Sequence, residues 1–161
     1  MRKIRIGTLV LSILVPLLVG AVSAALSAKG MASYATMSKP PLSPPAWVFS
    51  VAWTILYIMM GLASYLVLVS SVDTRSKVMA MAVYVVQLVM NFMWSIVFFD
   101  AQRYTMAFVW LMIMWCVVIL CMAKFYRIDR LAGFMMIPYV LWLTFAAYLN
   151  LGAAILSMKG R

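Results

Sequence analysis

Five long apolar runs constrain this chain more than any other feature of its sequence. Each run has the length of about 20 residues that an α-helix needs to cross the hydrocarbon core of a bilayer. Of the 161 residues, 68% are hydrophobic and 10% are charged, more apolar surface than a soluble domain could bury. The sequence therefore predicts an all-α integral membrane protein. It should be a single domain, 1–161, built as a bundle of five transmembrane helices at approximately 6–28, 46–69, 78–99, 104–125 and 131–156.

The first run has two interpretations. A basic start, an apolar stretch and the small-x-small pattern Val22-Ser23-Ala24 fit a signal peptide with its cleavage site. The run nevertheless continues through Leu26, which is long for such a peptide. Small residues also recur along it and would let a neighbouring helix approach closely: Pro16, Gly20, Ser23, Ala24 and Ser27. We therefore favour a retained span over a cleaved one.

The net charge of +10 comes from 13 Lys and Arg against 3 acidic residues. The basic residues stand around the ends of the runs, so contact with anionic lipid headgroups explains them better than nucleic-acid binding does. Eight lie on the side of the amino terminus and five on the other, which predicts a cytoplasmic amino terminus. The expected partner is a lipid bilayer, with no nucleic acid.

A proline-rich segment separates the first two runs. Four prolines fall within six positions between Lys39 and Trp47. Because proline fixes its own φ and disfavours helix at the preceding residue, this segment should be stiff and extended. Ser43 is expected to cap a helix whose first residue is Pro44. The whole stretch 29–45 is predicted as the longest loop, either a tether between spans or an ordered lid.

Two runs carry polar and aromatic residues along one helical face, at spacings of three and four residues. In the second run these are Ser50, Trp53, Tyr57, Gly61 and Ser64. In the third run they are Tyr84, Gln87, Asn91, Trp94 and Phe98. The amides of Gln87 and Asn91 lie too deep in the bilayer to remain unpaired, so they should turn into the bundle. They would act there as interhelical hydrogen bonds or as the polar wall of a pocket.

The fourth and fifth runs differ in whether they carry such a polar and aromatic face. The fourth has no polar stripe and is expected to face lipid or a second copy of the chain. Cys116 and Cys121 point in different directions around it, so no disulfide is expected. In the fifth run, Pro138 should kink the helix or open a local gap. Beyond the proline, Tyr139 and Trp142 share one face.

Several kinds of chemistry are missing from the sequence. It has no histidine and no glutamate, which excludes His-based nucleophilic triads, His/Cys metal sites and His-ligated haem. Asp73, Asp100 and Asp129 all fall in predicted loops, so no carboxylate relay crosses the membrane. We therefore expect no metal site and no required cofactor. The remaining aromatic walls, amides and hydroxyls suit a flat, hydrophobic ligand.

A series of short motifs runs through the chain in a fixed order. They are Lys39-Pro40 with Pro44-Pro45 and Trp47, Trp53-Thr54-x-x-Tyr57 with Gly61, Gln87-x-x-x-Asn91-x-x-Trp94, Phe98-Phe99, Pro138-Tyr139-x-x-Trp142-x-x-Phe145 and Leu149-Asn150. Each motif alone is weak. Together, across five runs, they resemble the TspO/MBR family, the tryptophan-rich sensory proteins related to the mitochondrial translocator protein.

The resemblance implies a five-helix membrane fold, often a homodimer, that binds porphyrins, haem and related tetrapyrroles. Members also bind synthetic isoquinoline carboxamides, and animal members bind cholesterol. Here Leu151-Gly152-Ala153 lacks the tyrosine and the basic residue of the animal cholesterol motif, which argues against cholesterol as a ligand. A multi-pass protein of a bacterial cell membrane is the expected location.

Carried over by motif position, the resemblance implies a pocket made by residues of three runs: Trp53, Tyr57, Asn91, Trp94, Tyr139, Trp142, Phe145 and Ala146. Lys39 flanks the loop over this expected pocket, where it would meet the anionic propionates of a porphyrin. Some bacterial members are reported to break down porphyrin in light, which makes Trp53 and Trp142 the candidate catalytic residues.

We thus expect a membrane-embedded tetrapyrrole-binding protein that acts as a sensor or regulator of porphyrin level or stress. Two alternatives stay open. One is a light- and oxygen-dependent enzyme that degrades porphyrin, and the other is a small carrier of amphipathic molecules. Product formation in light would distinguish the enzyme, and net movement across a vesicle membrane would distinguish the carrier.

Overall fold

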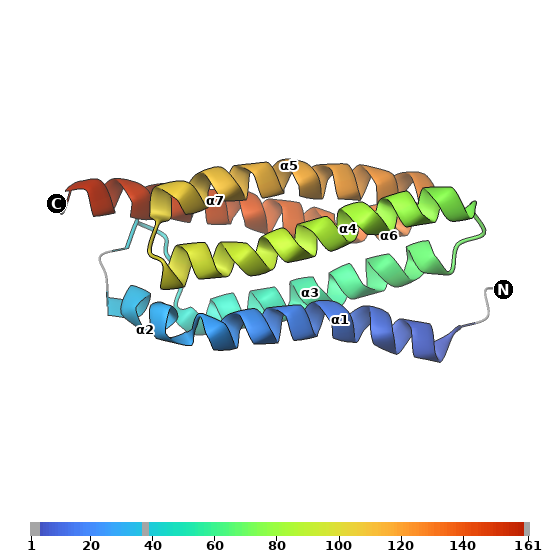
Figure 1. Ribbon diagram of the computed structural model, residues 1–161, viewed down its shortest axis with the longest axis horizontal. Coiled ribbons are helices and arrows are strands. Elements are labelled where there is room, and N and C mark those ends of the chain that lie inside the picture. The colour runs from blue at the N-terminus through green and yellow to red at the C-terminus, as the bar shows by residue number, and fades with distance from the viewer. Residues whose placement is uncertain (1–3, 37–38, 160–161) are drawn as a thin grey trace.

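The computed structural model describes residues 4–36 and 39–159, which form an elongated bundle of helices along one common axis (Figure 1). In chain order the helices are α1 (Ile6–Leu26), α2 (Ala28–Thr36), α3 (Ala46–Leu68), α4 (Thr74–Ser95), the π-helical turn η1 (Ile96–Asp100), α5 (Tyr104–Ile128), α6 (Arg130–Met135) and α7 (Ile137–Lys159). No β-strand occurs in this described part of the chain.

Five stretches are long and apolar enough to cross a membrane: Ile6–Leu26, Trp47–Leu68, Thr74–Asp100, Tyr104–Ile128 and Arg130–Met158. The predicted all-α bundle of five transmembrane helices is confirmed. The largest shift in a predicted end is at the third span, which begins at Thr74 instead of 78. The reason is a cap, since the Asp73 carboxylate accepts a hydrogen bond of 2.9 Å from the backbone N–H of Ser76.

The face predicted for the third span points inward, and so does the face predicted for the second span except at Ser50, which is exposed. On α3, Tyr57 and Ser64 are buried, whereas Val51 and Ile55 on the opposite face are about half exposed. The whole stripe predicted on the third span is buried: Tyr84, Gln87, Asn91, Trp94 and Phe98. Helix α1 packs tightly on α3 at Gly61 of α3. A Cβ at that position would lie 2.6 Å from the Ser12 carbonyl oxygen of α1, so only glycine leaves enough room.

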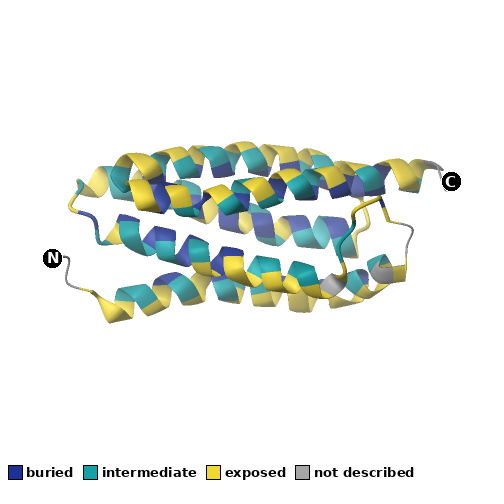
Figure 2. Ribbon diagram, turned by 180° about the vertical axis from the view of Figure 1, so that it is seen from behind, coloured by how far each residue is buried: buried dark blue, intermediate teal, exposed yellow. Residues whose placement is uncertain are grey.

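Helix α5 packs against both α4 and α7, and Figure 2 shows the change from buried to exposed residues around each helix. One face of α5 is completely buried: Ala107, Leu111, Met114, Val118, Cys121 and Phe125. The expectation that this span faces lipid is wrong for that face, because close packing in a membrane requires no polar stripe. Cys116 is exposed and Cys121 is buried, so both are free, as predicted.

The stretch 29–45, predicted as a loop, is largely ordered structure. Its first part belongs to helix α2, and residues 39–45, here called the strap, cross over to α7. The Tyr148 hydroxyl donates a hydrogen bond of 2.9 Å to the Pro41 carbonyl oxygen. Pro40 packs where Gly152 has no side chain. Of the two alternatives for this segment, the contacts of the strap are those of an ordered lid and not of a loose tether.

The predicted cap at Ser43 is wrong. Helix α3 begins at Ala46 with Pro45 in the N-cap position, and no side chain caps it. Pro44 cannot be the first helical residue because the ring of Pro45 disfavours helical backbone at the residue before it. The Ser43 hydroxyl instead donates a hydrogen bond of 2.7 Å to the Pro40 carbonyl oxygen, within the turn that places Leu42 at a φ of 65°.

The fifth span is interrupted near Pro138, as predicted. Helix α6 ends at Met135 and α7 begins at Ile137, so the break lies at Met136 and the proline stands in the first turn of a new helix. A proline is tolerated there because the first backbone N–H groups of a helix have no partner within it. The break creates a short helix, α6, at the amino-terminal end of the bundle.

Candidate functional site

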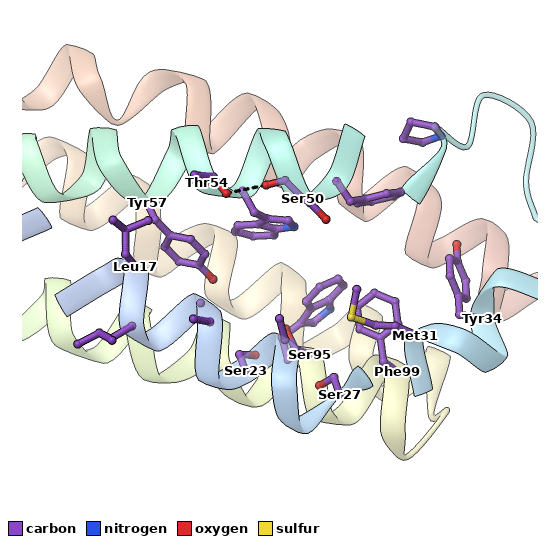
Figure 3. Close-up of a pocket in the computed structure, with 18 of the residues that line it drawn as sticks. Leu17, Ser23, Ser27, Met31, Tyr34, Ser50, Thr54, Tyr57, Ser95 and Phe99 are labelled. Carbon is purple, nitrogen blue, oxygen red and sulfur yellow. Dashed lines mark hydrogen bonds between the residues drawn. The ribbon is translucent and has the colours of Figure 1, made fainter. Parts of the chain in front are cut away.

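A cavity of about 500 Å³ lies between α1, α2, α3 and the end of α4 (Figure 3). Its walls are mostly apolar, and six aromatic side chains line it: Tyr34, Phe49, Trp53, Tyr57, Trp94 and Phe99. In Figure 3, Tyr57 and Thr54 of α3 lie across the cavity from Ser23 of α1 and from Ser27, which follows α1. This volume is within the range of ~300–1,000 Å³ that is usual for small-molecule sites.

Helix α1 supplies one whole wall of the cavity, which the sequence did not reveal. The lining includes Gly20 and also Ala21, Ser23 and Ala24, whose small side chains keep the space open. The sequence predicts this small-residue face as a surface for close helix packing. That interpretation holds at Gly20, where the Tyr57 ring of α3 occupies the space that a side chain would need, but Ser23 and Ala24 of the same face border the cavity.

The aromatic walls are built from stacked pairs. The Trp53 ring stacks on Tyr57 with 5.5 Å between ring centroids and 29° between planes. The Trp94 ring stacks on Phe98 at 5.1 Å and 20°. The residues of each pair are four apart, within α3 for the first pair and across the junction of α4 and η1 for the second, so a continuous helical face brings the rings together.

Asn91 joins three helices beneath this wall. Its Oδ1 accepts a hydrogen bond of 2.6 Å from the Tyr57 hydroxyl, and its Nδ2 donates one of 3.0 Å to the Tyr139 hydroxyl. Gln87 is also fully buried, with its Nε2 3.6 Å from the Met60 sulfur. Neither amide lines the cavity. Their contacts are therefore interhelical hydrogen bonds and do not form the polar wall of a pocket.

Two buried polar groups at the cavity have no hydrogen-bond partner among the described residues. They are the indole N–H of Trp94 and the hydroxyl of Ser27. Both residues line the cavity. A buried polar group without a partner is costly, so these two groups reduce the stability of the bundle beside the cavity.

The residues of the fifth span stand behind the wall. Trp142 contacts Trp53 edge-on at 6.4 Å between ring centroids, and Tyr139 contacts it at 6.1 Å. Phe145 packs on Trp142 at 5.8 Å, and Ala146 is buried. The proposed set thus separates into two layers. Trp53, Tyr57, Trp94 and Lys39 line the cavity, and Asn91, Tyr139, Trp142, Phe145 and Ala146 do not.

The mouth of the cavity lies under α2 and the strap. The Lys39 ammonium stands 5.5 Å from the centroid of the Tyr34 ring, a cation–π distance. The Tyr34 ring is held against Phe98 and Phe99, with centroids 5.2 and 5.6 Å away. Burial, and to a smaller extent the neighbouring Tyr104, raises the pKa of Tyr34, so its hydroxyl stays protonated at neutral pH. The mouth therefore offers one cation and one neutral hydroxyl.

One side of the cavity reaches the outer surface of the bundle. Six exposed residues form this rim, four from α1 and two from α3: Leu14, Leu18, Ala21, Ala24, Ser50 and Thr54. The Thr54 hydroxyl donates a hydrogen bond of 2.8 Å to the Ser50 carbonyl oxygen, so it is satisfied within its own helix. In a bilayer this rim would face acyl chains. Among the described residues, no three His, Cys, Asp or Glu side chains come together as a metal site.

Comparison with known proteins agrees with this architecture. The model of the TspO/MBR family matches residues 12–156. The chain is 38% identical over 120 residues to a tryptophan-rich sensory protein of Cereibacter sphaeroides, covering 74% of this chain and 73% of that one. It is 36% identical over 117 residues to the tryptophan-rich protein TspO of Chlorobaculum tepidum, covering 73% and 74%. It is 33% identical over 123 residues to the human translocator protein, covering 76% and 73%. The chain belongs to the TspO/MBR family of multi-pass membrane proteins.

Proposed function

We propose that this protein binds a porphyrin-type tetrapyrrole in the cavity between α1, α2, α3 and α4, and acts as a sensor or regulator of porphyrin level or stress. The observation that carries the proposal is an apolar cavity of about 500 Å³ lined by six aromatic rings with a lysine at its mouth. A porphyrin is a flat aromatic ring system with carboxylates on one edge. It would stack on the rings and direct its carboxylates to the cation.

Specific residues would have separate tasks in this complex. The Trp53–Tyr57 pair and the Trp94 ring offer flat surfaces for the macrocycle. Lys39 offers a charge to a propionate at the mouth. The exposed rim between α1 and α3 gives a ligand dissolved in the bilayer a direct route into the cavity.

Quenching of tryptophan fluorescence by protoporphyrin IX tests the proposal. We expect saturable quenching with one site per chain, and competition by an isoquinoline carboxamide that occupies the same cavity. Trp53→Ala should weaken binding, whereas Trp110→Ala, outside the cavity, should not. Quenching that rises linearly without saturation, or that is equal in both variants, would overturn the proposal.

A second function, light-dependent porphyrin degradation, is favoured by the contact between Trp53 and Trp142. An excited porphyrin with dissolved oxygen is a strong oxidant, and Trp53 in the wall could give up an electron that Trp142 behind it replaces. No carboxylate lines the cavity among the described residues, so turnover should depend on light and oxygen and not on an acid–base pair.

Illumination of the complex with product analysis separates these functions. If the protein is an enzyme, Trp53→Phe and Trp142→Phe should keep the apolar wall and most binding while abolishing product. If the parent protein forms no product in light, the sensor function stands. Net porphyrin transfer across reconstituted vesicles would instead identify a carrier.

A further inference from the structure

A second cavity, of about 310 Å³, lies on the flank of the bundle where α5 ends and α6 and α7 begin. Its lining is apolar apart from one cation and includes Met122, Tyr126, Arg127, Gly133, Phe134 and Ile137. It is at the opposite end of the bundle from α2 and the strap (Figure 1). We call it the flank groove. It shares no residue with the aromatic cavity.

The walls of the flank groove are fixed by packing. The Asp129 carboxylate caps α6, accepting hydrogen bonds of 2.9 and 3.2 Å from the backbone N–H groups of Leu131 and Ala132. Gly133 then lets α6 approach α5, since a Cβ there would lie 2.5 Å from the Tyr126 Cβ. The Tyr126 and Phe134 rings meet edge-on at 5.5 Å. These contacts form the groove without a flexible loop.

The groove faces the bilayer. Tyr126, Phe134 and Ile137 are 43%, 54% and 40% exposed, and they belong to stretches that cross the membrane. The medium outside such side chains is lipid acyl chain. From Arg127, one residue before the end of α5, the groove runs inward along the helix to Met122. A cation at the interface followed by an apolar channel has the order of groups in a phospholipid, with its headgroup outside and its chains inside.

The charges around the groove favour a lipid with an anionic headgroup. Six cations of the described chain lie at this end of the bundle: Arg5, Arg75, Lys77, Lys124, Arg127 and Arg130. Only two carboxylates lie there, and both cap helices: Asp73 and Asp129. The local field is therefore positive. A guanidinium also binds a phosphate through two parallel N–H groups, which makes arginine suited to this headgroup.

We propose that the flank groove is a binding site for one anionic phospholipid. Its phosphate pairs with the Arg127 guanidinium, and one acyl chain lies along Met122 and Ala123, against the outer side of the Tyr126–Phe134 ring pair. An anionic peptide or soluble protein would meet the cations but could not follow the apolar channel below the headgroups. This site is independent of the function proposed for the aromatic cavity.

Native mass spectrometry of the full chain in detergent, with lipid added, tests the site. The probes are phosphatidylglycerol and phosphatidylcholine with identical acyl chains. We expect one phosphatidylglycerol per chain to survive detergent removal, and phosphatidylcholine to bind about tenfold more weakly, because it lacks net charge. Equal retention of both lipids would overturn the proposal.

Three variants locate the binding. Arg127→Gln should lower phosphatidylglycerol affinity about tenfold. Ala123→Phe, which fills the groove and leaves every charge in place, should do the same. Arg75→Gln, at the same end of the bundle but outside the groove, should bind as the parent does. An equal loss from Arg75→Gln, or parent-like binding by Ala123→Phe, would show a general surface charge effect and refute the site. Protoporphyrin quenching should be unchanged in all three.

Discussion

The ring of Tyr57 fills the space into which any side chain at Gly20 would project. A Cβ on Gly20 would lie 2.7 Å from Cδ2 of that ring and closer still to Cε2. The glycine therefore sets the position of an aromatic wall across the boundary between α1 and α3. It also protects the hydrogen bond of 2.6 Å that the Tyr57 hydroxyl donates to Asn91.

Gly20→Ala should destabilise the bundle, although alanine is the better helix former. The added methyl must displace the Tyr57 ring, and overpacking of this kind costs ~1–3 kcal/mol. Thermal unfolding in detergent should show a lower midpoint. Gly7→Ala is the matched control, because no atom lies within 4 Å of its Cβ, and it should gain up to ~1 kcal/mol of helix stability. Equal midpoints for the two variants would contradict the steric argument.

Tyr57→Phe should destabilise the protein by ~1–3 kcal/mol, because it leaves the Asn91 Oδ1 buried without its donor. Tyr148→Phe removes the same atom from an exposed side chain whose hydroxyl bonds to the Pro41 carbonyl oxygen. Pro41 is exposed and lies outside the membrane-crossing stretches, so water can bind its carbonyl oxygen instead, and the cost should be smaller. Unfolding midpoints of the two variants measure the difference, and a larger loss at Tyr148 would refute the role given to Asn91.

Trp53→Ala should weaken protoporphyrin IX binding about tenfold, because a stacking surface in the cavity wall is lost. Trp142→Ala should have a smaller effect, since Trp142 stands behind Trp53 and acts through its position. Fluorescence or absorbance titration of each variant gives the affinities. A larger effect of Trp142→Ala would mean that the ligand lies deeper toward α7 than the cavity does.

Lys39→Gln should weaken the binding of a dicarboxylate porphyrin more than the binding of its dimethyl ester, because only the acid is attracted by the cation at the mouth. Added salt should reduce the difference through screening. Lys29→Gln removes a lysine of α2 that does not line the cavity, and its acid-to-ester affinity ratio should equal that of the parent. An unchanged ratio for Lys39→Gln would assign this lysine to lipid headgroups.

Acid should weaken the start of α4. Hydrogen bonds from Ser76 hold the pKa of Asp73 below its ordinary value. The pKa of Asp73 is therefore lower in the folded protein than in the unfolded chain. The stabilisation from this carboxylate is fully present above its pKa in the unfolded chain, and it is lost as the pH falls through its pKa in the folded protein. Asp73→Asn keeps a capping side chain that does not titrate. The difference in unfolding midpoint between parent and variant should therefore be largest at pH 7 and shrink toward pH 3. A constant difference would contradict the assignment.

The spans and their inward faces could be predicted because both are local properties of the sequence. A run of apolar residues has a length, and a helical face has a period, so Tyr84 to Phe98 could be assigned to one buried stripe. Helix α2 could not be predicted in this way. It has nine residues, fewer than an isolated helix needs to be stable, and contacts made by the Tyr34 ring with Phe98 and Phe99 hold it in place.

The layers of the site were equally out of reach. A helical face shows the direction in which Trp53 and Trp142 point, but not which of the two stands in front of the other. That order depends on how the axes of α3 and α7 are spaced, and only the packed bundle fixes it. Likewise, a small-residue face on α1 is compatible with close contact and with a cavity, and both occur along it.

Because the aromatic cavity is bounded by the first three spans together, it comes into existence only when α1 has docked on α3. A ligand therefore has no site on a chain whose first span still stands apart in the lipid. Occupancy adds RT ln(1 + [L]/Kd) to the free energy of the assembled bundle, about 2.7 kcal/mol at a hundredfold excess over Kd. The ligand would thus serve as an assembly factor during biogenesis, and the amount of mature protein in the membrane would follow its supply.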